Sequence, residues 1–401
     1  MNEKQRPSIR FKGFTEYWEQ GKISDYGDFY YGHSCPKWSV SENATTPCVR
    51  YGELYTKFGT KINQVYSYTN MPPEKLRFSK GTEVLIPRVG EDPMDYNHCT
   101  WLSLSNVAIG EMISVYNTNQ NPQFTAIMFN ATLQKQFAMR VEGGSVTNLY
   151  FEKLKDIDIS FPSIKEQCKI TTYFSSLDHL ITLHEKKYNR LVNIKKSMLE
   201  KMFPRNGKTV PEVRFAEFTG DWERRKLGEV VKYRNGKAHE NDISEQGKYI
   251  VVNSKFVSTN GEVRKFSNKQ KEPLFKNEIA FVLSDVPNGR AIARTFLVDK
   301  DDKYTLNQRI AGITPTENIC PYYLYVLMNR NKYFLQFDDG VKQTNLSVTD
   351  VMEFEGYYPS SEEQHKIGAY FENLDHLIAI HQQKVEKLQN MKKSCLKKMF
   401  V

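Results

Sequence analysis

The residue types most often used in catalysis and metal binding are scattered along this chain without a recognisable spacing. Its six cysteines show neither paired zinc-type spacing nor a disulfide framework, which predicts reduced thiols in the cytoplasm. His179 and His184 would lie about 140° apart on a helix, too far to share a metal ion, and His376 and His381 repeat this spacing. We interpret His184 and His381 as a hydrogen-bonded core pair. The sequence therefore predicts no metal site.

Three short segments resemble catalytic motifs only superficially. Methyltransferases that position a target amine use Asn/Asp-Pro-Pro-Tyr/Phe, and the segment Met-Pro-Pro-Glu at 71–74 lacks both outer residues. Glu-Gly-Gly-Ser at 142–145 is typical of a turn and does not form a glycine-rich cofactor loop after a strand. Glu-Lys-Leu-Lys at 152–155 has no acidic strand to complete a nuclease site. We predict no catalytic residue in this chain, with a fused enzyme as the alternative.

Basic and amide side chains in loops are the groups best suited to a function. The net charge of +9, a pI near 9.0 and 13% aromatic residues are typical of proteins that bind polyanions. Lysine and arginine contact phosphates, while arginine, asparagine, glutamine, serine and tyrosine also reach base edges. The candidate DNA contacts are Lys37, Arg50, Tyr51, Tyr55, Lys57 and Arg88 in the first half, and Arg234, Asn235, Lys237, Asn253, Lys255, Arg290 and Lys342 in the second.

The elements that must position these residues occur twice. The segment 163–203 recurs as 360–400 with more than half of its positions identical, and the segment 7–19 recurs as 211–223. Such long-range self-similarity indicates a duplicated structural unit. The sequences between the repeats are only faintly similar in the two halves. The order of elements is therefore repeated, while the sequences between the repeated segments differ.

Each closing repeat predicts a long helix. Ser163 with Glu166, and Ser360 with Glu363, have capping-box spacing at the helix start. Apolar residues then alternate at spacings of four and three, a heptad-like pattern that favours an antiparallel coiled coil. A helix of about 40 residues would be a rod of roughly 60 Å. The predicted helix seam, also a candidate surface for partner docking, contains Ile170, Phe174, Leu177, Ile181, His184, Leu191, Ile367, Phe371, Leu374, Ile378, His381 and Leu388.

The variable segments predict mixed α/β domains. Short apolar or alternating runs at 46–51, 83–88, 248–253 and 278–283 are typical of strands that lead into exposed loops. Ser347 with Asp350 predicts a further helix cap. No stretch has the apolar length of a membrane span, and we expect a cytoplasmic protein. The fold class is α+β, with two globular mixed α/β domains alternating with two long helices in pseudo-two-fold symmetry. Its predicted parts are 1–160, the helix 161–205, 206–357 and the helix 358–401.

The order of these parts resembles the specificity subunit of type I restriction-modification enzymes. The resemblance rests on P-x-[IV]-R-F-x-x-F-T-x-x-W-E opening each half and P-S-x-x-E-Q leading into each helix, and it covers essentially the whole chain. The segments LSDVPNG at 283–289 and LNQRI at 306–310 also support the resemblance. The resemblance implies that each variable domain reads one half of a split, asymmetric site in double-stranded DNA. The helices would set the gap between the half-sites.

The resemblance also implies partners and cofactors. Methyltransferase subunits, two of them if both docking surfaces are occupied, would dock on the helices, and motor-nuclease subunits would join the assembly. S-adenosylmethionine, ATP and Mg would then be bound by those partner subunits, with no cofactor bound by this chain. A scaffold that binds only proteins is the remaining alternative, because heptad stripes serve helix packing whatever the partner.

Overall fold

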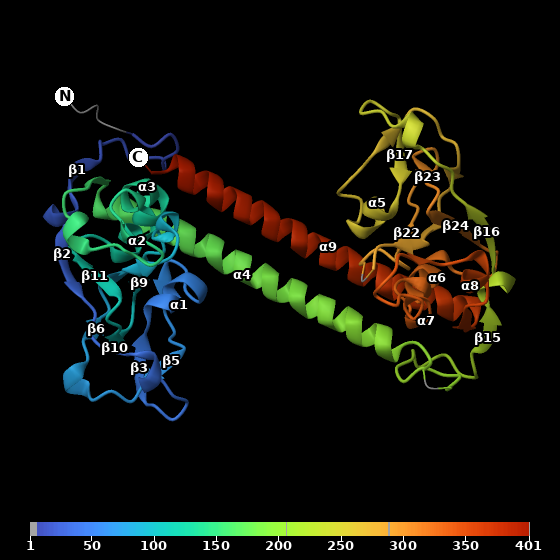
Figure 1. The fold of residues 1–401 in the computed structure, drawn as a ribbon, viewed down its shortest axis with the longest axis horizontal. Helices are drawn as coiled ribbons and strands as arrows, with labels where there is room; N and C mark the ends of the chain where they lie inside the picture. The colour runs from blue at the N-terminus through green and yellow to red at the C-terminus, as the bar shows by residue number, and fades with distance from the viewer. Residues whose placement is uncertain (1–5, 206, 288, 401) are drawn as a thin grey trace. The chain divides into compact units, whose positions relative to one another are not determined.

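The computed structural model describes residues 6–205, 207–287 and 289–400, so Asn288 of the LSDVPNG phrase lies outside the described residues. The chain divides into two compact units, one made of Met1–His184 with Lys384–Val401 and the other of Glu185–Gln383. Each unit holds one globular domain together with a stretch of the long helix α4 (Ile164–Lys201) and a stretch of the long helix α9 (Ser361–Lys398) (Figure 1). We call the globular parts the first domain, residues 19–161, and the second domain, residues 223–358.

The first domain is built on two main sheets joined by short helices. The larger sheet has the strand order β2-β11-β7-β9-β4, and the smaller has the order β5-β3-β10-β6, in which β3 and β10 are parallel. Strand β1 pairs with β14 where the chain enters and leaves the domain. The elements are β1 (Glu19–Lys22), β2 (Gly27–Tyr31), β3 (Thr46–Val49), α1 (Tyr51–Thr56), β4 (Lys61–Ile62), β5 (Ser67–Thr69), β6 (Phe78–Lys80), β7 (Glu83–Pro87), β8 (Val89–Gly90), β9 (Thr100–Leu102), β10 (Ser105–Ile109), β11 (Ile113–Thr118), α2 (Pro122–Thr132), α3 (Gln134–Ala138), β12 (Glu142–Gly143), β13 (Thr147–Asn148) and β14 (Asp158–Phe161).

The second domain repeats this topology although its sequence matches only faintly. Its sheets have the orders β16-β24-β20-β22 and β18-β17-β23-β19, with β17 and β23 parallel, and β15 pairs with β26. The fold class predicted from the sequence is therefore confirmed. The elements are β15 (Glu223–Lys226), β16 (Val231–Asn235), β17 (Tyr249–Val252), α5 (Ser254–Ser258), β18 (Phe266–Ser267), β19 (Pro273–Leu274), β20 (Ile279–Val282), β21 (Ser284–Asp285), β22 (Thr295–Leu297), β23 (Tyr304–Leu306), β24 (Ile310–Pro315), α6 (Pro321–Met328), α7 (Lys332–Leu335), β25 (Thr344–Asn345), α8 (Val348–Met352) and β26 (Glu355–Tyr358).

The strands predicted from apolar runs are confirmed at β3, β7, β17 and β20. All four residues of β20 and all five of β7 are buried, because helices or the second sheet cover both faces of these strands. The cap predicted at Ser347 is also confirmed. Its hydroxyl accepts from the backbone N–H of Asp350, and the Asp350 carboxylate accepts from the backbone N–H of Ser347.

The starts of both long helices are as predicted, but their capping boxes are only half formed. Ser163 Oγ accepts from the backbone N–H of Glu166 at 3.4 Å, and Ser360 Oγ accepts from that of Glu363 at 3.3 Å. The carboxylates of Glu166 and Glu363 do not accept hydrogen bonds from the backbone N–H groups of Ser163 and Ser360. The reciprocal half of the capping box was a wrong expectation, because an arginine of the opening repeat binds each carboxylate.

In unit 1 this arginine is Arg10. Its Nε and Nη2 donate to the two carboxylate oxygens of Glu166 at 2.6 and 2.7 Å, and the Glu166 side chain is almost fully buried. In unit 2 Arg214 binds Glu363 in the same two-pronged way, at 2.8 and 2.8 Å. Planar guanidinium–carboxylate pairing is strong and directional. In each unit, therefore, the opening repeat binds the closing repeat through this arginine–glutamate pair.

The glutamine after each of these glutamates ties its helix to the domain. Gln167 Nε2 donates to the carbonyl of Pro162, and its Oε1 accepts from the backbone N–H of Asn121, the N-cap of α2. Gln364 makes the equivalent bonds to Pro359 and Cys320, the latter at the N-cap of α6. Both glutamines are buried, so every such bond satisfies a group removed from water.

Within each unit the two helix stretches run antiparallel. In unit 1 the hydroxyl of Tyr173 lies 3.5 Å from Cys395 Sγ, and Lys392 donates to Asp178 at 2.5 Å. In unit 2 Lys195 donates to Asp375, and the ring of Phe203 lies 6.0 Å from that of Phe371. A continuous coiled coil along both helices stays a prediction, as does the pairing of His184 with His381.

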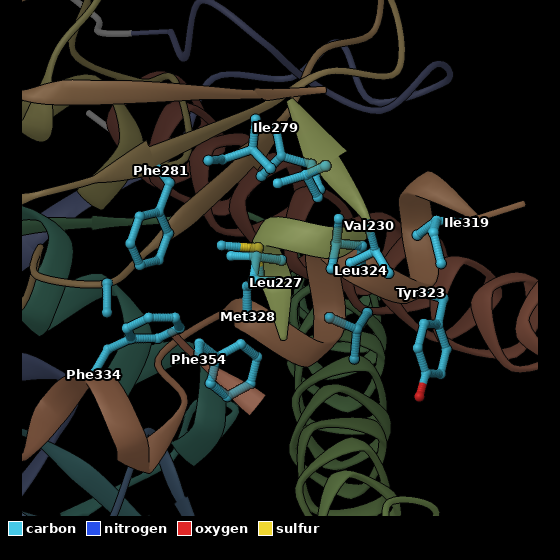
Figure 2. Close-up of a cluster of buried hydrophobic side chains, with 14 of the residues drawn as sticks. Leu227, Val230, Ile279, Phe281, Ile319, Tyr323, Leu324, Met328, Phe334 and Phe354 are labelled. Carbon is cyan, nitrogen blue, oxygen red and sulfur yellow. The ribbon is translucent and has the colours of Figure 1, made fainter. Parts of the chain in front are cut away.

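The first half of each predicted seam belongs to a domain core. Figure 2 shows the core of unit 2, where Phe281, Phe334 and Phe354 pack near Leu227 and Met328. This cluster also contains Ile367, Phe371 and Leu374 of α9, while Ile170, Phe174 and Leu177 of α4 lie in the equivalent cluster of unit 1. These six side chains are at most 7% exposed, which leaves them no accessible surface for a partner. The remaining seam residues, Ile181, His184, Leu191, Ile378, His381 and Leu388, are half-buried.

Candidate nucleic-acid interface

A cluster of loops gathers around the turn between β10 and β11 in the first domain. The backbone N–H of Gly110 donates to the carbonyl of Val49, and that of Glu111 donates to the carbonyl of Ser34. The carbonyl of Met112 accepts from the backbone N–H of Arg88. The ends of strands β2, β3 and β7 therefore meet at one place. We call the loops at Gly32–Ser34, Arg50, Arg88 and Gly110–Met112 the first loop cluster.

The second domain builds the same cluster from different residues. The backbone N–H of Asn307 donates to the carbonyl of Val252, and that of Leu283 donates to the carbonyl of Arg309. The backbone N–H of Lys237 donates to the carbonyl of Leu306. We call Gly236–Ala238, Asn253, Leu283–Ser284 and Asn307–Arg309 the second loop cluster.

The close approach of these loops explains two glycines. A Cβ on Gly32 would lie 2.0 Å from the carbonyl oxygen of Gly110, and a Cβ on Gly236 would lie 2.0 Å from that of Asn307. Neither position can hold a larger residue without moving the adjacent backbone. The geometry of both clusters is thus set by the frame, and only the side chains that project from it differ.

The structure brings two of the predicted contacts of the first domain into the first loop cluster. Arg50 is the N-cap residue of α1 and is half-buried. Arg88 lies 4.9 Å over the ring of Tyr31, and its Nε has no hydrogen-bond partner among the described residues. Burial, followed by the hydrogen bond to Glu152, raises the pKa of Tyr31 to about 12, so its hydroxyl stays a proton donor. Its Nη2 lies 3.0 Å from Met112 Sδ, so Arg88 is held in place by the Tyr31 ring and by Met112.

The other predicted residues of the first domain lie in or next to α1 and on the short turn at Lys37–Ser39. Tyr51 opens α1, and Tyr55 donates its hydroxyl hydrogen to the carbonyl of Val89. Lys57 forms an ion pair with the buried Glu53 at 3.2 Å and lies 5.5 Å over the ring of Tyr66. Lys37 is exposed on a short 3-10 turn.

Arg234 of the second domain serves a structural ion-pair network. Its guanidinium donates to both carboxylate oxygens of Glu278 and to Glu272, and the Glu278 side chain is 5% exposed. The hydrogen bond to Glu278 raises the pKa of Arg234 despite burial. Burial alone would raise the pKa of Glu278, but hydrogen bonds from Arg234 and Thr314 lower it. The pairing occupies the guanidinium, so Arg234 is a poorer candidate for a base contact than its sequence context suggested.

The remaining predicted residues of the second domain are distributed over β16, α5 and several loops. Asn253 caps α5 by accepting from the backbone N–H of Phe256, and it stands where Arg50 stands in the first domain. Lys237 pairs with Glu272 at 3.0 Å. The other four predicted residues, Asn235, Lys255, Arg290 and Lys342, are exposed.

Two exposed residues of the second loop cluster are absent from the sequence-based candidates. Gln308 and Arg309 form the turn between β23 and β24, and Gln308 donates to Glu240 at 2.6 Å. The segment LNQRI at 306–310 contains both residues, and its sequence indicated only the resemblance to the family. Alignment of the two halves by their topology would have found them, because Glu111 and Met112 occupy the equivalent turn of the first domain.

Other kinds of site are not evident in the residues that the structure describes. No group of three or more histidine, cysteine, aspartate or glutamate side chains could hold a metal ion there. Among the same residues, no helix is long and apolar enough to cross a membrane. All six cysteines are free thiols.

Comparison with known proteins agrees with this geometry. Residues 104–193 and 219–390 match the model of the type I restriction modification DNA specificity domain. A similar protein is the type I restriction enzyme MjaVIII specificity subunit of Methanocaldococcus jannaschii, 23% identical over 313 residues, which cover 74% of each chain. The family match defines the class of protein as a DNA specificity protein. The chain belongs to the type I restriction-modification DNA specificity family, as its motifs indicated.

Solved structures share the fold. The S subunit of a type I restriction-modification system from M. genitalium has a TM-score of 0.66 at 15% identity, with 99% of each chain covered. A chain solved in work on complex assembly and conformational transition of the type I R-M system has a TM-score of 0.52 at 14% identity, covering 96% of this chain and 98% of that one. The resemblance thus spans the whole duplicated architecture and not one domain alone.

Proposed function

We propose that each domain of this specificity subunit reads one half of a bipartite, asymmetric site in double-stranded DNA. The observation that carries the proposal is the contrast between two loop clusters of the same backbone design and different side chains. Arg50 in the first cluster corresponds to Asn253 in the second, and Glu111 and Met112 correspond to Gln308 and Arg309. Arginine pairs best with guanine and asparagine with adenine in the major groove. Two such surfaces would read different sequences.

The two long helices act in this proposal as the spacer between the half-sites. Each has 38 residues, and at 1.5 Å per residue that is about 57 Å of continuous rod. Half-site centres one to two helical turns of DNA apart, roughly 35 to 70 Å, fit such a spacer. Both domains would then reach nearly the same face of the duplex.

The same helices are the proposed docking surface for methyltransferase subunits. Leu180 of α4 and Leu377 of α9 occupy equivalent positions in the repeat and are 40% and 42% exposed. Equivalent surfaces would accept two copies of one partner, and motor-nuclease subunits would complete the assembly. In this proposal S-adenosylmethionine, ATP and Mg act in those partners, and this chain contributes recognition without catalysis.

Methylome sequencing tests the function directly. Cells that express this chain with its matching modification subunits should carry one methylated bipartite motif, which returns both half-sites and the gap together. A methylated motif without a gap, or no motif, would count against two-domain reading. Purified chain alone, supplied with S-adenosylmethionine and DNA, should show no methylation, and a positive result would support the fused enzyme instead.

Salt dependence separates DNA reading from a protein-only scaffold. Phosphate contacts release counterions, so the affinity for DNA should fall steeply between about 50 and 200 mM salt. A DNA affinity of the assembled complex that did not change with salt concentration would support the protein-only scaffold.

A further inference from the structure

Trp38 differs from the other tryptophans of the chain by its exposure. Its side chain is 78% exposed, whereas Trp18 and Trp222 are 5% and 2% exposed. Trp101 is half-buried, donates its indole hydrogen to the carbonyl of Gly81 at 2.8 Å, and has Lys61 over its ring. An indole with this exposure offers a large apolar surface to a bound partner.

The turn that carries Trp38 is held rigidly. Pro36 precedes the 3-10 turn Lys37–Ser39, and the buried Ser39 hydroxyl lies 2.8 Å from that of Thr69 on strand β5. The carbonyl of Ser39 accepts from the backbone N–H of Asn70 at 2.9 Å. These bonds fix the backbone that carries the ring, which lowers the entropy cost of ordering the turn on binding.

This turn lies at the rim of the first loop cluster. Ser34, whose carbonyl accepts from Glu111, precedes Trp38 by a few residues, and the intervening Cys35 is buried in the domain. The exposed Lys37 stands next to Trp38 and can reach a phosphate. In the second domain the turn Glu240–Asp242, which has the equivalent place in the topology, contacts its loop cluster through the hydrogen bond from Gln308 to Glu240. The shared topology therefore places the turn of Trp38 next to the first loop cluster.

The equivalent turn of the second domain has the opposite chemistry. Val40 pairs with Thr69 after the first turn, and Ile243 pairs with Ser267 after the turn Glu240–Asp242. Asn241 there occupies the place of Trp38. Its two acidic neighbours are engaged, Glu240 by Gln308 and Asp242 by Lys269 and Lys271. Ile243, directly after the second turn, is 44% exposed, but an aromatic side chain at this turn occurs only in the first domain.

We propose that Trp38 inserts its indole ring as a wedge at a base step of the half-site read by the first domain. Apolar side chains placed in this way unstack a step and bend the duplex, which adds selectivity for deformable steps. The neighbouring Lys37 favours DNA over a protein partner. The inference rests on the proposed function and adds a bend and a contact that only the first half-site has.

Fluorescence of Trp38 provides the first test. The assembled complex with modification subunits is compared with the same complex carrying Trp38→Phe, so that the difference spectrum isolates Trp38. The probe is a duplex carrying the motif found by methylome sequencing, with a scrambled duplex of the same composition as control. The motif duplex should quench the difference signal and the scrambled duplex should not. Equal signals with both duplexes would overturn the wedge.

Affinity provides the second test. Trp38→Ala should weaken binding of the motif duplex by about 10- to 100-fold, the range for losing one base–aromatic contact. Binding of the scrambled duplex should stay within about twofold, because phosphates dominate it. Asn241→Ala is the matched control and should leave both affinities within about twofold of the unsubstituted complex.

The outcomes separate this inference from the proposed function. If the unsubstituted complex methylates a bipartite motif while Trp38→Ala binds it normally, the wedge alone is refuted. Normal DNA binding with reduced recovery of the methyltransferase subunit would assign Trp38 to a protein contact instead. Failure of the unsubstituted complex to methylate any motif would overturn both. Because the side chain is exposed, thermal unfolding of Trp38→Ala should match that of the unsubstituted chain, and the quenching test does not depend on that variant.

Discussion

Arg10 and Glu166 form a doubly hydrogen-bonded ion pair that joins the opening repeat of the chain to the start of α4. Arg214 and Glu363 form the same pair in the other unit. The exposed fractions of the side chains are 14% for Arg10 and 1% for Glu166. A guanidinium that spans two oxygens fixes both the distance and the angle between the segments it joins. The entry of each domain is thereby tied to the helix that leaves it.

Breaking one of these pairs should destabilise the unit that contains it. Glu166→Gln leaves Arg10 half-satisfied in a buried place, and we expect a loss of about 3 kcal/mol in the free energy of unfolding. Denaturant unfolding of the full chain measures it. Glu363→Gln is the matched change in unit 2 and should give a similar loss. Arg10→Lys should also destabilise, because lysine cannot span both oxygens.

A different outcome would revise the role of the pair. If Glu166→Gln unfolds at the same denaturant concentration as the unsubstituted chain, the pair is a by-product of packing. The helix start would then depend on Ser163 and Gln167 alone.

Substitutions in one loop cluster should alter one half-site only. Arg309→Ala should weaken or relax recognition of the second half-site by about 1 to 3 kcal/mol per lost base contact. The first half-site should be unchanged in the methylome of the same cells. Arg50→Ala is the reciprocal change in the first domain. Loss of both half-sites from either substitution would show that the clusters do not act separately.

Arg234→Gln separates structure from recognition. Because the Arg234 guanidinium binds Glu278, this change should lower stability and leave the methylated motif unaltered wherever the protein folds. An altered second half-site with unchanged stability would restore Arg234 to the base-contact group.

The gap between half-sites should follow the length of the helices. Inserting four residues after Lys187 adds about one turn, or 5.4 Å, to α4, which corresponds to one or two base pairs of DNA. A paired insertion after Lys384 adds the same turn to the equivalent place in α9 and preserves the antiparallel match. We expect a wider gap and two unchanged half-sites in the methylome. A changed half-site sequence would contradict the division between spacer and readers.

The ion pair of Glu278 predicts a pH dependence of stability. Its folded-state pKa is lowered below the ordinary value of 4.5, so the stabilisation is fully present above that value. It is lost as the pH falls from about 4.5 through the lower folded pKa. Glu278→Gln should therefore unfold more easily than the unsubstituted chain at pH 7, by about 2 kcal/mol, and the difference should shrink below pH 4.5. Thermal unfolding at pH 7, 4.5 and 3.5 measures it. A constant difference would mean that the carboxylate charge is irrelevant.

The repeats alone predicted much of this fold. Duplicated text, capping serines and heptad spacing are local patterns, so the two long helices begin at Ile164 and Ser361 as expected. Apolar runs located four core strands for the same reason. The reciprocal half of each capping box was wrong, because a competing partner for Glu166 lies far away in the chain.

What the sequence determined by itself is the family, the duplicated order of parts and the kind of ligand that its charge favours. These depend on residue type and spacing along the chain. Only the tertiary structure decided that Arg10 binds Glu166, that Arg234 is occupied by Glu278, and that Arg309 sits in the equivalent turn of a second loop cluster. The role of each of these arginines depends on which distant segments of the chain lie next to it. An arginine can therefore be buried in an ion pair or exposed at the surface, and its neighbours in the sequence do not decide which. The exposure of Trp38 is likewise a property of the folded surface and not of its neighbours in sequence.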